Sequence, residues 1–197
     1  MTHQPKEITR ADILPMSDYG AIRKEKRSAL VAQKKHRRVA VGPDATFYFE
    51  SYDTMWLQVH EMLFIEKGGE EQIADELAAY NPLIPQGSEL VATLMFEIDD
   101  ETRRKRVLGQ LGGVEETITI TIGDHVITGV AEEDVDRTTA DGKASSVQFL
   151  HFPFTAEQIA AFKDPAQQAV LGIGHENYQH MAALGADTRA ALAADFD

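Results

Sequence analysis

Hydrophobic residues are most concentrated between Phe47 and Gly69, in a stretch that contains the only tryptophan, Trp56. Within it, large apolar side chains recur every three to four residues, which is the spacing of one face of an α-helix. Ser51 is a favourable residue for capping the start of this helix, and glycine commonly follows a helix end. Further apolar side chains lie off the main face, so we predict a central helix that is buried on most of its circumference. Its inward-facing residues are expected to be Tyr52, Met55, Trp56, Val59, Met62 and Leu63.

Three further elements are expected in the first half of the chain. Residues 17–36 place apolar side chains at helical spacing among many Lys and Arg residues, which predicts an amphipathic helix. Residues 37–41 and 45–49 alternate weakly and are predicted to pair as a hairpin across Gly42-Pro43-Asp44. Residues 70–80 are predicted to form a second helix antiparallel to the central one, with an acidic first turn that suits the helix dipole.

The pattern changes to strands in the second half. Residues 115–122 alternate Thr with Ile, and this period of two predicts a strand with one buried and one solvated face. Residues 89–98 are largely apolar and are predicted to form a central strand. Gly123-Asp124 is typical of a tight hairpin turn. The other elements expected are strands over 125–131 and 145–152, a fifth strand or a helix end over 168–173, and helices over 100–111, 155–162 and 186–196.

These elements together predict an α+β protein. N-terminal helices, including the buried central helix, are followed by a mostly antiparallel sheet of about five strands with C-terminal helices. The length of 197 residues predicts a single domain over residues 1–197. Within it we expect a basic N-terminal segment over 1–40, a helical hairpin over 45–85, and a sheet with covering helices over 89–197.

The composition narrows the compartment and the chemistry. The chain contains no cysteine, which excludes disulfides, cysteine-held iron–sulfur clusters, thiolate zinc sites and cysteine nucleophiles. No apolar run approaches the roughly 20 residues that a membrane-spanning helix needs. The first residues lack the apolar core of a signal peptide. We therefore expect a cytoplasmic protein that does not enter the membrane.

Charge is unevenly distributed along the chain, whose formal net charge is -13. Residues 1–40 carry ten Lys and Arg against four Asp and Glu, a balance of +6, whereas residues 41–197 have a balance of -19. The simplest expectation is that the basic segment docks on the acidic remainder. The alternatives are a solvated helix face or an anionic partner such as RNA, DNA or lipid. Nucleic acid is the weaker of these, because a nucleic-acid binder presents a basic surface across its working face.

A narrow polar line interrupts the apolar surface of the central helix, and its ionisable members are Glu50, His60 and Glu61. Polar groups on a buried helix need partners, because an unpaired one costs roughly 1–3 kcal/mol. The line therefore either meets solvent and backbone groups or forms a buried functional site. His60-Glu61 resembles the start of a zinc-binding HExxH helix, but Phe64 occupies the place of the second histidine, which excludes that motif.

The densest group of potential metal ligands lies between His175 and His180. Glu176 and His180 are four residues apart and would share one face of a helix. The two histidines would converge if the segment began as a loop, and His151 on the neighbouring strand would supply a third ligand. This group would suit a metal or haem, and two His with one carboxylate is a recognised arrangement for iron. The alternative is a helix N-terminus with its polar residues facing outward.

Other sequence templates identify no reaction. The chain has no GxGxxG, GxxxxGKS/T or GxSxG motif. The carboxylate clusters at 99–101 and 132–134 are interpreted as a helix start and a solvated strand end, with weak Ca²⁺ or Mg²⁺ binding as the alternative. A general acid/base pair cannot be chosen among 32 carboxylates without their geometry.

Five segments together resemble a bacterial family numbered thirty-five hundred and one among the domains of unknown function. They are EITRADILPM, VGPDATFYFES, MWLQVHEML, EEQIADELAAYNPLIP and ELVATLMFEIDD, and the resemblance extends over nearly the whole chain. Members of that family are often encoded beside a rubrerythrin and an iron–sulfur oxidoreductase, which implies a role in peroxide defence or electron transfer. The segment HENYQH is similar to the family's C-terminal pattern of a His followed closely by a Tyr, which ranks His175 and Tyr178 first among the site candidates.

Three functions are compatible with these observations. The leading expectation is an accessory protein of a bacterial oxidative-stress or redox system, acting with a rubrerythrin-like diiron protein. It would either bind a metal or haem itself, with iron or haem as the cofactor, or dock to the redox partners, which include the iron–sulfur oxidoreductase. The second is a small metal-dependent enzyme that uses His175, His180 and His151. The third is a structural interaction module, such as a homodimer formed through sheet edges or the helical hairpin.

Overall fold

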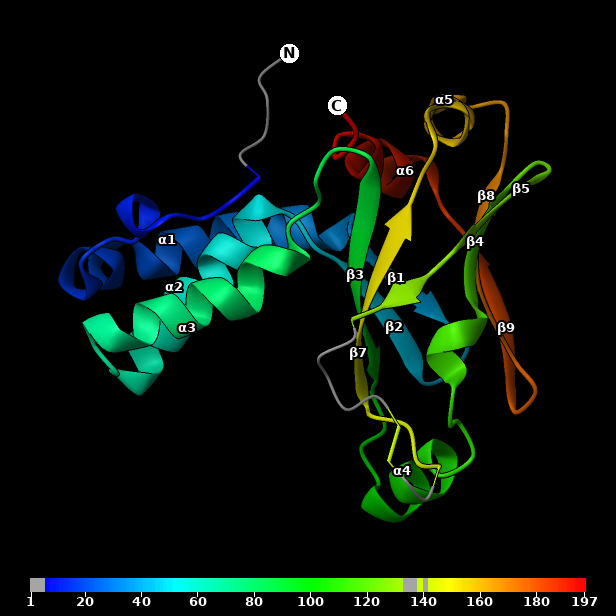
Figure 1. Cartoon of the computed structure of the whole chain (residues 1–197), viewed down its shortest axis with the longest axis horizontal. Coiled ribbons are helices and arrows are strands. Elements are labelled where there is room, and N and C mark those ends of the chain that lie inside the picture. The colour runs from blue at the N-terminus through cyan, green and yellow to red at the C-terminus, as the bar shows by residue number, and fades with distance from the viewer. Residues whose placement is uncertain (1–5, 133–137, 140–141) are drawn as a thin grey trace.

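The computed structural model describes residues 6–132, 138–139 and 142–197 and contains a helical layer beside two antiparallel sheets (Figure 1). The layer consists of α1 (Met16–Lys35), α2 (Tyr52–Glu66) and α3 (Glu70–Tyr80). Shorter helices lie at the two ends of the sheets, with α4 (Glu101–Leu108) at one end and α5 (Ala156–Lys163) and α6 (Ala186–Ala193) at the other. Short 3₁₀ turns cover Arg10–Asp12, Asn81–Leu83 and Val114–Thr117.

The strands form two separate sheets. The five-stranded sheet has the order β1-β2-β3-β7-β6, and the four-stranded sheet has the order β5-β4-β8-β9. The first contains β1 (Arg38–Val41), β2 (Ala45–Phe49), β3 (Glu89–Phe96), β7 (Val147–Pro153) and β6 (Val130–Ala131). The second contains β5 (His125–Thr128), β4 (Ile118–Ile122), β8 (Ala169–His175) and β9 (Tyr178–Ala183). The α+β class and the antiparallel pairing predicted from the sequence are confirmed.

The main hydrophobic core lies between the two sheets. Leu94 of β3 and Ile120 of β4 both belong to it and are completely buried. Burial of each such side chain contributes roughly 1.5–3 kcal/mol. The alternation of buried Ile with half-buried Thr along β4 confirms the prediction of a strand with one buried face.

A second, smaller core joins the helical layer to the outer face of the five-stranded sheet. It combines Val91 of β3 with residues of α2 such as Val59. Because successive side chains of a strand point to opposite faces, residues 89, 91, 93 and 95 of β3 turn toward the helical side while 90, 92, 94 and 96 enter the main core. Polar groups of β3 are thereby presented to the helices.

The central helix predicted from the sequence is confirmed, and of the fifteen residues of α2 only Asp53, Ile65 and Glu66 are exposed. Ser51 caps this helix by accepting a hydrogen bond from the N–H of Thr54. Trp56 is partly buried and Ile65 is 62% exposed. Helix α2 contacts α1, α3 and the outer face of the five-stranded sheet, so it is covered on several sides. Its buried residues are Thr54, Met55, Val59, His60 and Leu63.

Two segments differ from their predicted structures. The single strand expected over 125–131 is divided at Gly129, where the chain passes from one sheet to the other. A Cβ at Gly129 would lie 3.1 Å from the ring of Phe152, so glycine allows the close approach. Residues 169–175 and 178–183 pair as β8 and β9. This hairpin replaces the helix N-terminus that was considered for the segment after Gly174. The sequence predicted one sheet of about five strands. The division at Gly129 and the additional strand β9 instead give two sheets.

The basic N-terminal segment docks on the acidic remainder through several ion pairs. Arg10 pairs with Glu70 at 2.5 Å, Arg23 with Glu61 at 2.8 Å, and the buried Arg37 with Asp195. This is the intramolecular docking expected from the charge distribution. Among the described residues, no helix is both long and apolar enough to cross a bilayer.

Candidate functional site

A pocket of about 390 Å³ opens between the outer face of the five-stranded sheet and the helical layer. Its buried polar side chains are Arg37, Glu50, Thr54 and Thr93. Apolar walls come from both layers and include Met55, Leu83, Met95, Val147 and Phe149. More exposed polar side chains complete the lining, namely Lys34, Tyr48, Gln58 and Tyr80. The pocket therefore combines a buried carboxylate and a buried guanidinium with apolar walls.

Glu50 is placed in this pocket by the end of β2. Phe49 belongs to the main core, so the next side chain turns to the opposite face of the sheet. The N–H of Glu50 donates to the carbonyl of Val91 at 2.8 Å, and its own carbonyl accepts from Arg37 at 2.7 Å. Ser51 then begins α2. The backbone of Glu50 is therefore fixed between a strand and a helix.

Both carboxylate oxygens of Glu50 accept hydroxyl hydrogen bonds. Thr54 donates to Oε2 at 2.6 Å and Thr93 donates to Oε1 at 2.8 Å. A carboxylate offers about four acceptor positions, so two donors leave capacity for a ligand. No Lys, Arg or His among the described residues forms an ion pair with this carboxylate. The guanidinium of Arg37 instead contacts Asp195 and the carbonyls of Phe49, Glu50 and Ala191.

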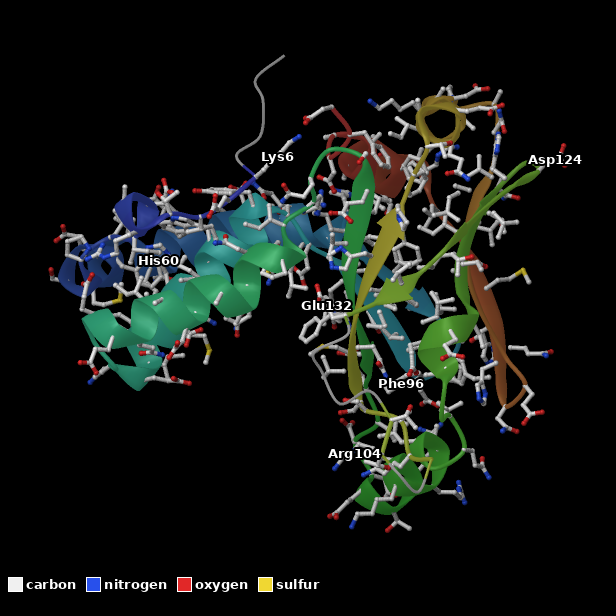
Figure 2. All side chains as sticks on the ribbon, in the orientation of Figure 1. Lys6, His60, Phe96, Arg104, Asp124 and Glu132 are labelled. Carbon is white, nitrogen blue, oxygen red and sulfur yellow. The ribbon has the colours of Figure 1, made fainter. Side chains whose placement is uncertain are left out.

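His60 is a structural residue in the helical layer (Figure 2). Its Nε2 accepts from the N–H of Leu14 at 3.1 Å, so Nδ1 carries the proton and donates to the carbonyl of Trp56 at 2.7 Å. Burial lowers the pKa of His60, partly opposed by the carbonyl of Trp56. Both ring nitrogens are therefore occupied, and His60 does not line the pocket over Glu50.

Glu61 holds α1 against α2. It accepts two hydrogen bonds from Arg23, each at 2.8 Å, and one from the hydroxyl of Tyr19 at 2.6 Å. The hydrogen bonds from Arg23, more than those from Tyr19, lower the pKa of Glu61 to about 2. Of the three ionisable residues on the predicted polar line, only Glu50 lines the pocket.

His151 lies on the outer face of the five-stranded sheet between two carboxylates. Its Nδ1 is 2.9 Å from Glu89 and its Nε2 is 2.7 Å from Glu132. Figure 2 shows Glu132 on the side of the sheets that faces the helical layer. Hydrogen bonding to Glu89 is the main cause that raises the pKa of His151. Both ring nitrogens donate when the imidazole is charged, so the arrangement favours the cationic form.

His175 and His180 lie in the other sheet, so the structure does not bring them together with His151. His175 contacts the carbonyl of Gly112 at 3.3 Å and accepts from the N–H of Asn177. His180 packs beside Tyr178, with ring centroids 4.6 Å apart. Glu176 is exposed in the turn between β8 and β9. The described part of the chain contains no group of three or more His, Asp or Glu side chains arranged to hold a metal ion.

Tyr178 connects the two sheets. Its hydroxyl accepts from the N–H groups of Asp44 and Ala45 and donates to the carbonyl of Val41, each at 2.9 Å. These partners form the hairpin between β1 and β2. The hydroxyl is thus saturated by backbone groups, and the His–Tyr pattern in this chain holds the fold together.

The pocket residues on β3 and β7 were not identified from the sequence. Thr93 stands between Ala92 and Leu94, and Phe149 lies in a strand whose polar side chains are Gln148 and His151. The available signal was the period of two, which places Thr93 opposite the core residues of its own strand. That signal identifies a face, but the helices that cover the face come from elsewhere in the chain.

Comparison with known proteins identifies a family and a similar solved structure. A family model described as "Protein of unknown function (DUF3501)" matches residues 7–196. A crystal structure titled as a novel protein of unknown function from Burkholderia pseudomallei K96243 has 35% sequence identity and a TM-score of 0.88. The similarity covers 96% of this chain and 99% of the other. No curated protein matches the chain.

Proposed function

The chain belongs to the DUF3501 family, and we propose that it is an accessory protein of a redox system that binds a small organic cation in the pocket over Glu50. The single observation that carries the binding proposal is the buried, hydroxyl-bonded carboxylate of Glu50, 8% exposed, beside an open pocket with apolar walls.

The charge of the site determines the ligand class. A carboxylate in an apolar surrounding is costly unless it is paired or well hydrogen-bonded. Thr54 and Thr93 supply two hydrogen bonds but no positive charge. Arg37 is committed to Asp195 and to carbonyls, and Lys34 is exposed. An ammonium group on a ligand would supply the missing charge and the additional donors.

The walls determine the rest of the ligand. A pocket of about 390 Å³ lies within the range of roughly 300–1,000 Å³ that is usual for small-molecule sites. Phe149, Met55 and Leu83 offer apolar contact, and Tyr48 and Tyr80 offer aromatic rings with polar tips. The ligand that fits this chemistry has a cationic end and an apolar or aromatic body.

The redox setting is supported by the family resemblance. The resemblance implies a rubrerythrin-like diiron protein and an iron–sulfur oxidoreductase as neighbours. The chain contains no cysteine, so its part in such a system would be to bind a ligand or a partner and not to carry a thiolate-held cluster. The proposal is tested by adding the purified chain to a purified rubrerythrin-like protein and its iron–sulfur reductase. We expect the rate of peroxide reduction to change, and an unchanged rate together with no complex would contradict this setting.

Ligand binding is tested separately with 2-phenylethylamine, 2-phenylethanol and phenylacetate, which share an aromatic body and differ in charge. Nuclear magnetic resonance titration should show that the amine binds about tenfold or more tightly than the other two, a difference of about 1.4 kcal/mol. Glu50→Gln should abolish that preference, whereas the exposed Glu116→Gln should retain it. Equal binding of all three compounds would contradict the proposed ligand class.

A further inference from the structure

Helix α1 is attached to the protein along one side only. Of its twenty residues, Tyr19 and Leu30 alone are buried. Tyr19 packs against Trp56, with ring centroids 6.0 Å apart, and Arg23 pairs with Glu61. The helix belongs to the layer that extends away from the sheets (Figure 1). Much of its surface is therefore turned to solvent.

The solvent side of α1 carries a basic row with an apolar centre. We call this the α1 row, and it comprises Lys24, Arg27, Val31, Lys34 and Lys35. Lys24, Arg27 and Val31 follow one another at spacings of three and four residues, and Lys34 and Lys35 lie three and four residues after Val31, so the side chains share one broad helix face. Val31 at its centre is 68% exposed. The row spans eleven helical steps, or roughly 17 Å.

The cations of the α1 row are largely uncommitted among the described residues. No carboxylate of the described chain lies within ion-pair distance of Lys24, Lys34 or Lys35. Arg27 reaches Glu61 only at 3.8 Å, and Glu61 is already bound by Arg23 at 2.8 Å. The internal docking of the basic segment therefore relies mainly on other side chains, and Arg27 is the one member of the row that reaches a carboxylate of the described chain.

We propose that the α1 row is a docking surface for a partner protein whose matching surface carries carboxylates around an exposed apolar side chain. Charge complementarity selects an acidic partner, and an apolar centre with a polar rim is the usual anatomy of a protein–protein contact. The exposed side chain of Val31 needs an apolar contact, which a phosphate backbone does not offer.

The α1 row is a separate surface from the pocket over Glu50, and the two share one residue. Lys34 belongs to the α1 row and also lines the pocket over Glu50. A partner seated on the row would cover that edge of the pocket, so ligand and partner would affect each other's affinity reciprocally. The docking inference itself does not require that the pocket be occupied.

The inference is tested on the full chain by fluorescence anisotropy with a labelled synthetic helix of about 20 residues that presents a leucine row flanked by glutamates. The variants Lys24→Glu, Lys35→Glu and Val31→Ser are compared with Arg106→Glu, which reverses an exposed charge on α4. We expect each charge reversal on the row to weaken binding about fivefold or more, Val31→Ser to weaken it about threefold, and Arg106→Glu to leave it unchanged.

Parallel titrations use a single-stranded RNA of similar length and vesicles of phosphatidylglycerol with phosphatidylcholine. Weaker binding of both than of the acidic helix would support a protein partner. Tighter binding of RNA or vesicles would overturn the proposal in favour of that polyanion. Salt-sensitive self-association that Lys35→Glu abolishes would overturn it in favour of a second copy of this chain. Equal peptide binding by all four variants would also overturn it.

Discussion

The hydroxyl of Thr93 donates a 2.8 Å hydrogen bond to the carboxylate of Glu50, 43 residues away in the sequence. This bond joins the middle of β3 to the junction between β2 and α2. It also orients the buried carboxylate beside the pocket. The same contact therefore contributes to the attachment of the helical layer and to the chemistry of the proposed ligand site.

Replacing Thr93 by Val should reveal the structural part of that contribution. The substitution keeps the branched shape and removes one of the two donors to a buried carboxylate. We expect the free energy of unfolding to fall by about 1–3 kcal/mol in urea denaturation. Thr128→Val, at an exposed position of β5, should change it by no more than about 0.5 kcal/mol. Equal effects at the two positions would contradict the role given to the Thr93 hydroxyl.

Removing the hydroxyl of Tyr178 should destabilise the fold because three backbone groups of the β1–β2 hairpin depend on it. Tyr178→Phe is expected to lower the free energy of unfolding by about 1–3 kcal/mol. Tyr48→Phe is the matched control, since the Tyr48 hydroxyl donates only to the exposed Glu97. An unchanged free energy of unfolding in Tyr178→Phe would contradict the structural role given to this hydroxyl.

The ion pair of Glu61 should make stability depend on acid pH. Its pKa is lowered to about 2 in the folded protein, against about 4.3 in an unfolded chain. The stabilisation is therefore complete above the unfolded value and is lost as the pH falls toward 2, and it amounts to about 3 kcal/mol. Glu61→Gln should accordingly be less stable than the wild type at pH 7, with a difference that narrows as the pH falls below 4. A constant difference would exclude this linkage.

His60 and His151 should titrate in opposite directions from the ordinary value of about 6.5. Burial lowers the pKa of His60, so the neutral imidazole stabilises the fold. This contribution is present above the ordinary pKa of about 6.5 and is lost as the pH falls from there toward the lowered pKa. The carboxylates of Glu89 and Glu132 raise the pKa of His151, so its contribution is present at lower pH and is lost as the pH rises through the raised value. Imidazole proton shifts measured by nuclear magnetic resonance should separate the two residues, and coincident curves would refute both assignments.

Local signals predicted most individual elements. Thr155 starts a helix through a capping box, and the Ile–Thr alternation of β4 marks a half-buried strand. Gly129 shows what local signals miss. One long strand and two short strands in different sheets show the same alternation of apolar and polar residues. The close approach of Phe152 to Gly129, where the chain changes sheet, involves a residue distant in the sequence.

The candidate site was predictable only in part. Glu50 was identified because a carboxylate next to a largely apolar helix needs partners, but the same argument selected His60 and Glu61, whose partners make them structural. The sequence analysis assumed a helix or a loop, in which His175 and His180 could converge on one site. In the β-hairpin, His175 instead pairs with Tyr178 and His180 pairs with Ile173. Long-range pairing therefore decided which ionisable residues became candidates for function.

The most direct test of the ligand site is a titration with 2-phenylethylamine that follows the carboxyl carbon of Glu50 and the methyl group of Thr93 by nuclear magnetic resonance. The account predicts that both signals shift together and saturate with one dissociation constant, and that Glu50→Gln removes saturation at Thr93. Unchanged signals at both residues, with the amine binding elsewhere or not at all, would contradict it.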